Sequence, residues 1–263
     1  MAIIKVLVHG ATGRMGREVI SALCGALDME LVGGVSRQPV EGVLTLPDHS
    51  GVVVLSSDLP ALLTDTRPQV VVDFSNAEAC LAAATEVLGK GVPFVTGTTG
   101  LTEDDLYRLD SMAVENQVGV VVAPNFSVGA VLMMSLVRKA APFFDYVDII
   151  ETHHEGKIDA PSGTAIALAR VASEEKEFIH TQPEKETLTG TRGGEYNGVG
   201  IYSLRQAGRS AHHEVVLGTL GQTLTLRHDT LGRDCYMPGV LRAIRNVVKL
   251  KGLVLGLEKI LGL

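Results

Sequence analysis

The chain has 263 residues, of which 46% are hydrophobic, and a formal net charge of −7 at pH 7. This length fits one large domain or two modest ones with a sizeable core. The acidic balance argues against nucleic acid or an anionic membrane as a partner, because both favour a basic surface, whereas a small anionic substrate needs only a local basic pocket.

The first half of the chain alternates apolar runs with helical patterns, which predicts parallel βαβ units and an α/β fold. The apolar runs predict strands over 3–8, 31–35, 52–55, 69–74, 93–96 and 118–122. Helical periodicity predicts helices over 16–27, 59–64, 77–89, 103–116 and 128–141. Residues 38–51 have the composition of a loop.

The pattern changes after Pro142, where a second, smaller sheet is predicted. Its predicted elements are, in order, a strand over 147–152, a helix from Ser162 to about Ser173, a polar loop over 174–200, and strands over 200–206, 214–220 and 222–228. The tail, 237–263, has the pattern of one or two helices. That is too little to fold alone, so we expect the tail to pack on the rest of the chain.

The three cysteines, Cys24, Cys80 and Cys235, are scattered and form no CxxC motif. They are typical of small buried residues in a reducing compartment rather than of a disulfide framework or a zinc site. The apolar run at residues 1–8 is too short for a signal peptide, and no stretch is long and apolar enough to span a bilayer. We therefore expect a cytoplasmic protein with no membrane partner and no bound metal.

A glycine-rich turn follows the first predicted strand and opens the first helix. It consists of Gly10, Ala11, Thr12, Gly13, Arg14, Met15 and Gly16, with GxxGxxG spacing. Glycine permits the tight turn and lets the backbone approach a pyrophosphate, which then binds the free N–H groups of the helix N-terminus. A βα turn without a ligand has the same pattern, but the position directly after a strong strand favours dinucleotide binding.

The end of the second predicted strand bears on the choice of cofactor. Folds that select NAD usually place Asp or Glu there to bind the ribose 2′-OH, whereas this chain has Ser36 followed by Arg37. A guanidinium pairs with a 2′-phosphate. We therefore expect the chain to bind NADPH, NADH or both, with some preference for NADPH. Alternatively, Arg37 stacks on the adenine and discriminates little between the two.

Two further segments follow predicted strands and are expected at the same edge of the sheet. They are Gly97-Thr98-Thr99-Gly100 and Ala123-Pro124-Asn125-Phe126. We expect both to contact the nicotinamide half of the cofactor, although each alone is also compatible with an ordinary βα loop.

Groups that exchange protons or bind anions are densest between Glu151 and Ala165. A histidine that titrates near neutrality exchanges protons, and adjacent histidines in a strand face opposite sides, so at most one of His153 and His154 serves as the acid. Lys157 offers a charge or a second proton. The turn Ser162-Gly163-Thr164 offers N–H groups at a positive helix start, which suits a carboxylate, although Ser162 or Asp159 also suits simple capping. The segment predicts a pocket that binds an anion and delivers a proton, the half of a reduction that a nicotinamide does not supply.

This segment also carries a family resemblance. Residues Glu151–Ala165 read ETHHEGKIDAPSGTA, which resembles the signature E-x-H-H-x-x-K-x-D-A-P-S-G-T-A of the dihydrodipicolinate reductase (4-hydroxy-tetrahydrodipicolinate reductase) family. The Gly10–Gly16 loop, Asp73-Phe74-Ser75, and the segments 97–100 and 123–127 match as well. The resemblance covers essentially the whole chain.

The resemblance implies NAD(P)H-dependent reduction of 4-hydroxy-tetrahydrodipicolinate, a small dicarboxylate, to tetrahydrodipicolinate with loss of water, in diaminopimelate and lysine biosynthesis. It implies that His153 exchanges the proton and that Lys157 is a second proton donor and carboxylate contact. Substrate binding falls to His154, Ser162, Gly163 and Thr164. Cofactor binding falls to residues 10–16, Ser36, Arg37, Gly97, Thr98, Thr99, Ala123, Pro124, Asn125 and Phe126.

The resemblance further implies a two-domain subunit of a homotetramer. A Rossmann-like, doubly wound parallel sheet is expected in residues 1–126 and 235–263, with a smaller α+β substrate-binding and tetramerisation domain in 127–234.

The chain departs from the family pattern at Ser36, at the pair Glu155-Gly156, where basic residues are common, and at Ala211–Glu214. The roles of His213 and Arg233 therefore stay open. Two other functions stay open as well: another NAD(P)H-dependent reductase of a small dicarboxylate, and a non-catalytic NAD(P)H-binding module. A semialdehyde dehydrogenase would need a nucleophilic cysteine, and a short-chain dehydrogenase would need Tyr-x-x-x-Lys; the sequence has neither in a convincing motif.

Overall fold

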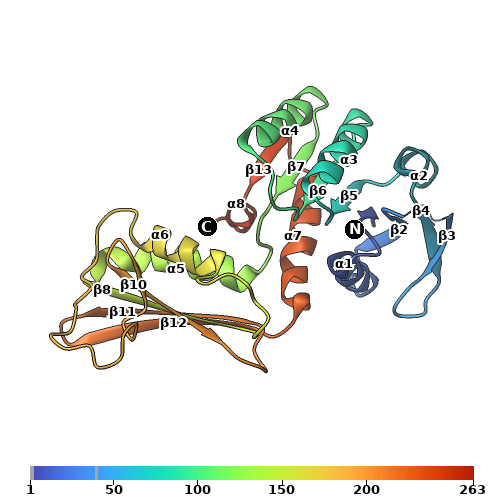
Figure 1. Cartoon of the computed structure of the whole chain (residues 1–263). Helices are drawn as coiled ribbons and strands as arrows, with labels where there is room; N and C mark the ends of the chain where they lie inside the picture. The colour runs from blue at the N-terminus through green and yellow to red at the C-terminus, as the bar shows by residue number, and fades with distance from the viewer. Residues whose placement is uncertain (1–2, 39–40) are drawn as a thin grey trace. The chain divides into compact units, whose positions relative to one another are not determined.

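The structure, a computed structural model, describes residues 3–38 and 41–263 (Figure 1). Residues 1–2 of the apolar N-terminal run and 39–40 of the predicted loop lie outside the described residues. The chain divides into two compact units: one runs up to Val128 and includes Arg233–Leu263, and the other is Gly129–Gly232. Each junction lies two residues from the predicted one. The roles expected of the two domains stay predictions.

The first unit is built on sheet A, whose eight strands run in the order β13-β7-β6-β5-β1-β2-β4-β3. All neighbours pair in parallel except β3 and β4. The strands are β1 (Ile4–His9), β2 (Met29–Val35), β3 (Glu41–Thr45), β4 (Val52–Ser56), β5 (Val70–Asp73), β6 (Phe94–Thr96), β7 (Gly119–Val122) and β13 (Gly252–Leu255).

Helices cover both faces of sheet A (Figure 1). On one face α2 (Leu59–Thr66), α3 (Ala77–Gly89) and α4 (Glu103–Glu115) pack side by side, and on the other face α1 (Arg14–Cys24) packs against α7 (Met237–Val247). Every residue of β5 and of β7 is buried, as the predicted doubly wound sheet requires, because parallel strands with helices on both faces lose contact with water on both sides. The predicted α/β, doubly wound fold is confirmed.

The direction of winding changes between β1 and β5. The chain builds β2, β3 and β4 on one side of β1 and then β5, β6, β7 and β13 on the other. In such sheets ligands bind beyond the carboxyl ends of the strands at this switch point. Here those ends carry His9 and Asp73, which lie opposite each other in the register of β1 and β5.

Three predictions of local structure are wrong. Within the loop expected over 174–200, the short strand β9 (Gly194–Tyr196) pairs antiparallel with β10 (Val199–Arg205). Within the expected loop 38–51, β3 forms an antiparallel edge strand with β4. Val43 of β3 is exposed, so this strand lacks the unbroken buried apolar run that marks the central strands. In the tail, β13 lies between α7 and α8 (Leu257–Leu261) and pairs with β7. The expected helices are present. The unexpected strand forms because its pairing partner, β7, lies more than a hundred residues earlier in the sequence.

The second unit is built on sheet B, whose five strands run in the order β12-β11-β8-β10-β9. The unit contains most of α5 (Val128–Ala140), then η1 (Ala141–Phe143), β8 (Tyr146–His153), α6 (Gly163–Ala172), β9 (Gly194–Tyr196), β10 (Val199–Arg205), β11 (Ala211–Thr219) and β12 (Gln222–Thr230), and η2 (Arg233–Tyr236) follows in the first unit. Only β8 and β10 pair in parallel, with α6 in the connection between them.

Helices α5 and α6 lie on one face of sheet B (Figure 1). The core between them contains Val137, Leu168, Ile149 and Leu217. Side chains alternate along β8, so Val147, Ile149, Glu151 and His153 all face this side and are buried. Apolar residues therefore fill one end of the covered face, and the titratable groups of the predicted site lie at the other end.

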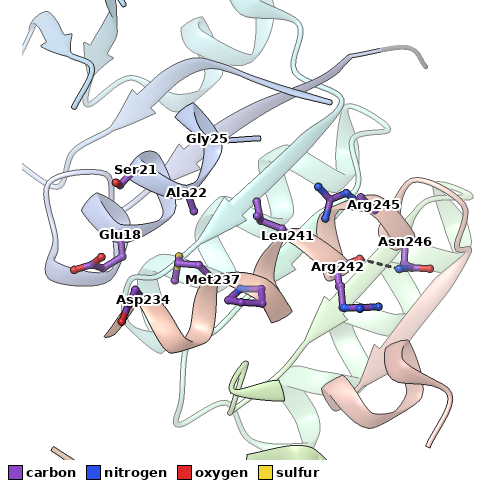
Figure 2. Close-up of a pocket in the computed structure, with 11 residues that line it drawn as sticks. Glu18, Ser21, Ala22, Gly25, Asp234, Met237, Leu241, Arg242, Arg245 and Asn246 are labelled. Carbon is purple, nitrogen blue, oxygen red and sulfur yellow. Dashed lines mark hydrogen bonds between the residues drawn. The ribbon is translucent and has the colours of Figure 1, made fainter. Parts of the chain in front are cut away.

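A pocket with a volume of about 770 Å³ lies between α1 and α7 in the first unit (Figure 2). Glu18 and Ser21 line it from α1, and Arg242 and Arg245 line it from α7. Arg245 also binds Asp28, with Nε and Nη2 2.7 and 2.8 Å from the carboxylate oxygens. The pocket contains none of the predicted cofactor or substrate residues. No helix in the described part of the chain is long and apolar enough to cross a membrane.

Candidate active site

The glycine-rich turn after β1 has the strained geometry that the sequence predicts for it. Gly10 has a φ of +80°, and a Cβ atom there would lie 2.6 Å from the carbonyl oxygen of Phe74. A Cβ at Gly16 would lie 2.1 Å from the carbonyl oxygen of Gly10. Glycine at both positions therefore lets α1 start directly against the turn, with its first backbone N–H groups beside the switch point.

The N-terminus of α1 is open to an anion. Gly13 is the N-cap, no side chain of the described residues caps the helix, and its first turn contains no acidic residue. The first N–H groups of a helix need acceptors, and the helix dipole favours a negative group there. The arrangement fits a pyrophosphate, which supplies oxygen acceptors and negative charge together.

Asp73 joins the ends of three neighbouring strands in sheet A. It is fully buried, and its Oδ1 lies 2.6 Å from His9 Nδ1 and 2.6 Å from Ser75 Oγ. Its Oδ2 accepts hydrogen bonds of 2.7 Å from the hydroxyls of Thr96 and Thr98. Burial on its own raises the pKa of Asp73, but the hydrogen bonds from His9, Ser75 and Thr98 outweigh it and hold the pKa below its ordinary value. The carboxylate thereby fixes the segment Gly97–Thr99 against the end of β1.

The remaining predicted cofactor residues lie at the ends of their strands in the same sheet. Ser36 is buried after β2, its Oγ lies 3.4 Å from Thr12 Oγ1, and its neighbour Arg37 is exposed. Ala123 donates its N–H to Thr96 O at 3.0 Å, so the segment Ala123–Phe126 begins beside Gly97. The rings of Phe126 and Phe74 pack with centroids 5.8 Å apart. The structure therefore brings the predicted cofactor segments to one edge of sheet A.

In the second unit, Glu151 and His153 lie two residues apart on the buried face of β8. The Glu151 carboxylate hydrogen-bonds His153 Nδ1 and receives a two-nitrogen contact from Arg205, at 2.9 and 3.1 Å. The backbone N–H of Ser162 contacts the same carboxylate at 3.3 Å. Burial would raise the pKa of Glu151, but Arg205, Ser203 and His153 more than offset this and lower it.

His153 is held next to a second buried histidine. Burial lowers the pKa of His153, and the neighbouring carboxylate of Glu151 opposes that shift. The ring of His213, on β11, meets the ring of His153 edge to face with centroids 5.4 Å apart. His213 Nε2 lies 3.1 Å from Ser162 Oγ, which also accepts the N–H of Ala165 as the N-cap of α6.

His213 is a neutral structural partner at neutral pH. Burial first, and then the nearby His153, lower its pKa to about 4. Because Ser162 Oγ accepts from Ala165, its O–H is free to donate to the unprotonated Nε2 of His213. The role that the sequence left open for His213 is therefore to hold Ser162 at the start of α6.

The other predicted substrate residues lie nearer the surface. His154 and Gly163 are exposed and Thr164 is half-buried in the first turn of α6, as the alternation along the strand predicts for two adjacent histidines. Lys157 Nζ binds Asp159 Oδ1 at 2.7 Å. Asp159 is exposed, so this ion pair is solvated and weak. Glu155 is exposed as well.

Sequence reasoning missed three residues that organise these sites. Asp73 and Glu151 were read only as parts of matching motifs, although the two-residue spacing of Glu151 and His153 was a signal that they share a face of a strand. Arg205 carried no signal, because its partner is brought to it by the parallel pairing of β8 and β10 across 54 residues.

The depressed pKa of His213 predicts that acid destabilises the fold. The folded-state pKa of about 4 lies below the ordinary 6.5, so an unfolded chain binds a proton at His213 that the folded chain rejects. The contribution of unprotonated His213 to the free energy of unfolding is therefore largest above pH 6.5 and decreases as the pH falls toward 4. The expected loss between pH 6.5 and 5 is about 2 kcal/mol. His213→Gln should show a shallower fall of the thermal unfolding midpoint over this range, with His153 contributing what remains.

The matched control is His154→Gln, which removes an exposed histidine from the same unit and should keep the wild-type slope. Equal slopes for His213→Gln and the wild type would contradict the assignment.

The comparisons with known proteins agree on one family. The family model described as "Dihydrodipicolinate reductase, N-terminus" matches residues 4–126, and the model "Dihydrodipicolinate reductase, C-terminus" matches residues 129–261. The 4-hydroxy-tetrahydrodipicolinate reductase of Dehalococcoides mccartyi strain BAV1 is 42% identical over all of both chains. The enzyme of that name from Moorella thermoacetica is 44% identical over 99% of each chain.

A solved structure, the dipicolinate-bound dihydrodipicolinate reductase of Paenisporosarcina sp. TG-14, is 38% identical, with a TM-score of 0.88 over 98% of this chain and 99% of that one. Sequence, fold and the length covered lead to the same conclusion: this chain belongs to the dihydrodipicolinate reductase family.

Proposed function

We propose that this chain reduces 4-hydroxy-tetrahydrodipicolinate to tetrahydrodipicolinate with NAD(P)H and loss of water, in diaminopimelate and lysine biosynthesis. Relatives that carry the enzyme's name match the chain from end to end, and the solved relative holds dipicolinate, a planar dicarboxylate. The observation that carries the proposal is the buried His153, held by Glu151 beside the N-terminus of α6. It places a proton-exchanging group next to backbone donors suited to a carboxylate.

The cofactor and the side chains supply different parts of the reduction. A nicotinamide cofactor supplies hydride when bound, and the residues of this chain hold the substrate and supply the proton. His153 is the proton donor or acceptor, and Lys157 is a second donor and a carboxylate contact. Ser162, Gly163 and Thr164 offer hydroxyl and N–H donors at the start of α6, and His154 contacts the substrate from the exposed side of the segment.

The cofactor is proposed to bind along the carboxyl edge of sheet A. The uncapped N-terminus of α1 and the turn Gly10–Gly16 hold the pyrophosphate, and Ser36 with Arg37 meets the adenosine ribose. The segments Gly97–Thr99 and Ala123–Phe126 contact the nicotinamide half. The exposed guanidinium of Arg37 supports acceptance of NADPH, because it is free to pair with a 2′-phosphate.

Cysteine chemistry fits the chain poorly. Burial, followed by the nearby charge of Asp73, raises the pKa of the Cys80 thiol to about 12, and burial also raises the pKa of Cys24. A nucleophilic cysteine needs the thiolate. These two thiols are therefore unsuited to the acyl chemistry of a semialdehyde dehydrogenase.

The His153→Ala variant should lower kcat by on the order of a hundredfold or more, because the general acid is lost. Dipicolinate binding, measured by calorimetry, should change much less, since the helix start and Lys157 remain. The readout is NADPH oxidation with freshly made substrate. Wild-type turnover in this variant would remove His153 from the mechanism, and cofactor binding without oxidation in the wild type would favour a binding module.

The Arg37→Ala variant separates two ways of contacting the cofactor. If Arg37 pairs with the 2′-phosphate, the KM for NADPH should rise about tenfold, equivalent to about 1.4 kcal/mol, while the KM for NADH stays within twofold. Arg108→Ala, which removes an exposed arginine from α4, should change neither value. An equal rise for both cofactors would instead indicate that Arg37 stacks on the adenine.

The face of sheet B that carries no helix supports the proposal of a homotetramer. No helix of the described unit packs on the face opposite α5 and α6. Ile150, Tyr202 and Val216 alternate toward that face and are half-buried, and Leu204 is exposed. A row of apolar side chains on a sheet face without a covering helix suits a self-complementary interface.

Light scattering should therefore give four times the 27.9 kDa chain mass. Val216→Glu should yield smaller species, whereas Leu220→Glu, at the exposed β11–β12 turn, should remain tetrameric. A wild-type monomer would refute the proposal. The cytoplasm remains the predicted location.

A further inference from the structure

The carboxylate of Glu151 uses all of its hydrogen-bonding capacity. Oε1 accepts from Arg205 Nη2 at 2.9 Å and from the N–H of Ser162 at 3.3 Å. Oε2 accepts from Arg205 Nη1 at 3.1 Å and hydrogen-bonds His153 Nδ1. A carboxylate offers about four acceptor positions, and these four contacts account for them, with the Ser203 hydroxyl nearby as a further donor that lowers the pKa of Glu151.

The two terminal nitrogens of the guanidinium that holds Glu151 are also fully hydrogen-bonded, whereas its buried Nε has no partner among the described residues. Nη1 of Arg205 also donates to its neighbouring carbonyl oxygen, Leu204 O, at 2.7 Å, and Nη2 donates to Asp159 O at 2.6 Å. The four hydrogens on the two terminal nitrogens therefore all have acceptors. Because the guanidinium is always protonated, its fork fixes Glu151 in the ionised form and in one orientation.

These counts decide which nitrogen of His153 carries the hydrogen. An ionised carboxylate only accepts, and Arg205 and the Ser162 amide only donate, so the hydrogen between Glu151 and His153 belongs to Nδ1. The neutral imidazole then has its lone pair on Nε2. The atom that takes up and releases the catalytic proton is therefore Nε2.

We propose that Glu151 is the positioning residue of the proton-transfer site: it fixes the Nδ1–H tautomer of His153 and, through the same carboxylate, holds the amide of Ser162 at the start of α6. The proton donor and the carboxylate-binding turn are thereby set by one side chain. This inference rests on the proposed role of His153. Arg205 acts on the His153 ring through Glu151, which it keeps ionised.

The charged and titratable groups around His153 give the proposal a pH signature. They are Glu151 on its own strand, Arg205 from β10, His213 from β11, and Lys157 from the loop before α6. Glu151 is the group among them that favours protonated His153, whereas Lys157 and Arg205 oppose it. Removing the Glu151 charge therefore makes His153 lose its proton at a lower pH.

The first test is Glu151→Gln, which keeps the shape and removes the charge. We expect kcat to fall by between about tenfold and a hundredfold, with a smaller change in the KM for the substrate. The alkaline limb of the kcat profile, which reports loss of the proton from His153, should move down by on the order of one pH unit. Glu151→Asp keeps the charge, so its limb should stay near the wild-type position even if its shorter reach lowers kcat.

Glu155→Gln is the matched control, since it removes an exposed carboxylate four residues along the same segment. Its kcat and its pH profile should match those of the wild type. A Glu151→Gln enzyme with wild-type kcat and an unshifted limb would overturn the proposal. If His153→Ala itself kept full turnover, the proposed function of His153 would fail instead, so the two failures are distinguishable.

A measurement on the unaltered enzyme covers the case in which Glu151→Gln does not fold. Histidine labelled with ¹⁵N reports its tautomer directly by NMR, and His153→Gln identifies the signal. The Nδ1–H form with a hydrogen-bonded Nδ1 proton is expected at neutral pH. A dominant Nε2–H form would overturn the proposal.

Discussion

A carboxylate that is taken out of water must have its oxygens satisfied by donors, and this constraint organises both units of the chain. Asp73 and Glu151 are each fully buried, and each has four polar contacts. Around Asp73 the partners are a histidine and three hydroxyls from neighbouring strands and loops. Around Glu151 they are a histidine, a guanidinium fork and a backbone amide. In both places, one buried carboxylate holds together the ends of neighbouring parallel strands.

The two acids serve different chemistry because their partners differ. Asp73 is surrounded by small hydroxyl side chains on short connections, which hold backbone segments at the carboxyl edge of sheet A where a dinucleotide is proposed to lie. Glu151 has a permanent cation as its main partner, which makes its charge independent of pH near neutrality. A neighbouring histidine then titrates against a constant field, which is what a proton donor requires.

The sequence allowed the doubly wound sheet to be predicted because strands such as Val70–Asp73 are buried on both faces and read as unbroken apolar runs. Glu41–Thr45 could not be recognised, since an exposed edge strand has no such pattern. Gly252–Leu255 is a strand because β7, more than a hundred residues earlier in the sequence, supplies its partner. The density of polar groups between Glu151 and Ala165 predicted a site there, and the family resemblance singled out His153. The contacts of Glu151 with Arg205 and of Ser162 with His213 depend on strand pairing, which local patterns do not encode.

The place of β13 in sheet A has a consequence for synthesis of the chain. The whole second unit, Gly129–Gly232, is made between β7 and its neighbour β13. While the ribosome makes those residues, β7 presents an open edge, and the face that α7 later covers on β5, β6 and β7 is bare. An open edge and an uncovered apolar face are the features that promote aggregation. The second unit is contiguous, so the first unit, although it begins to emerge earlier, is the later of the two to be completed.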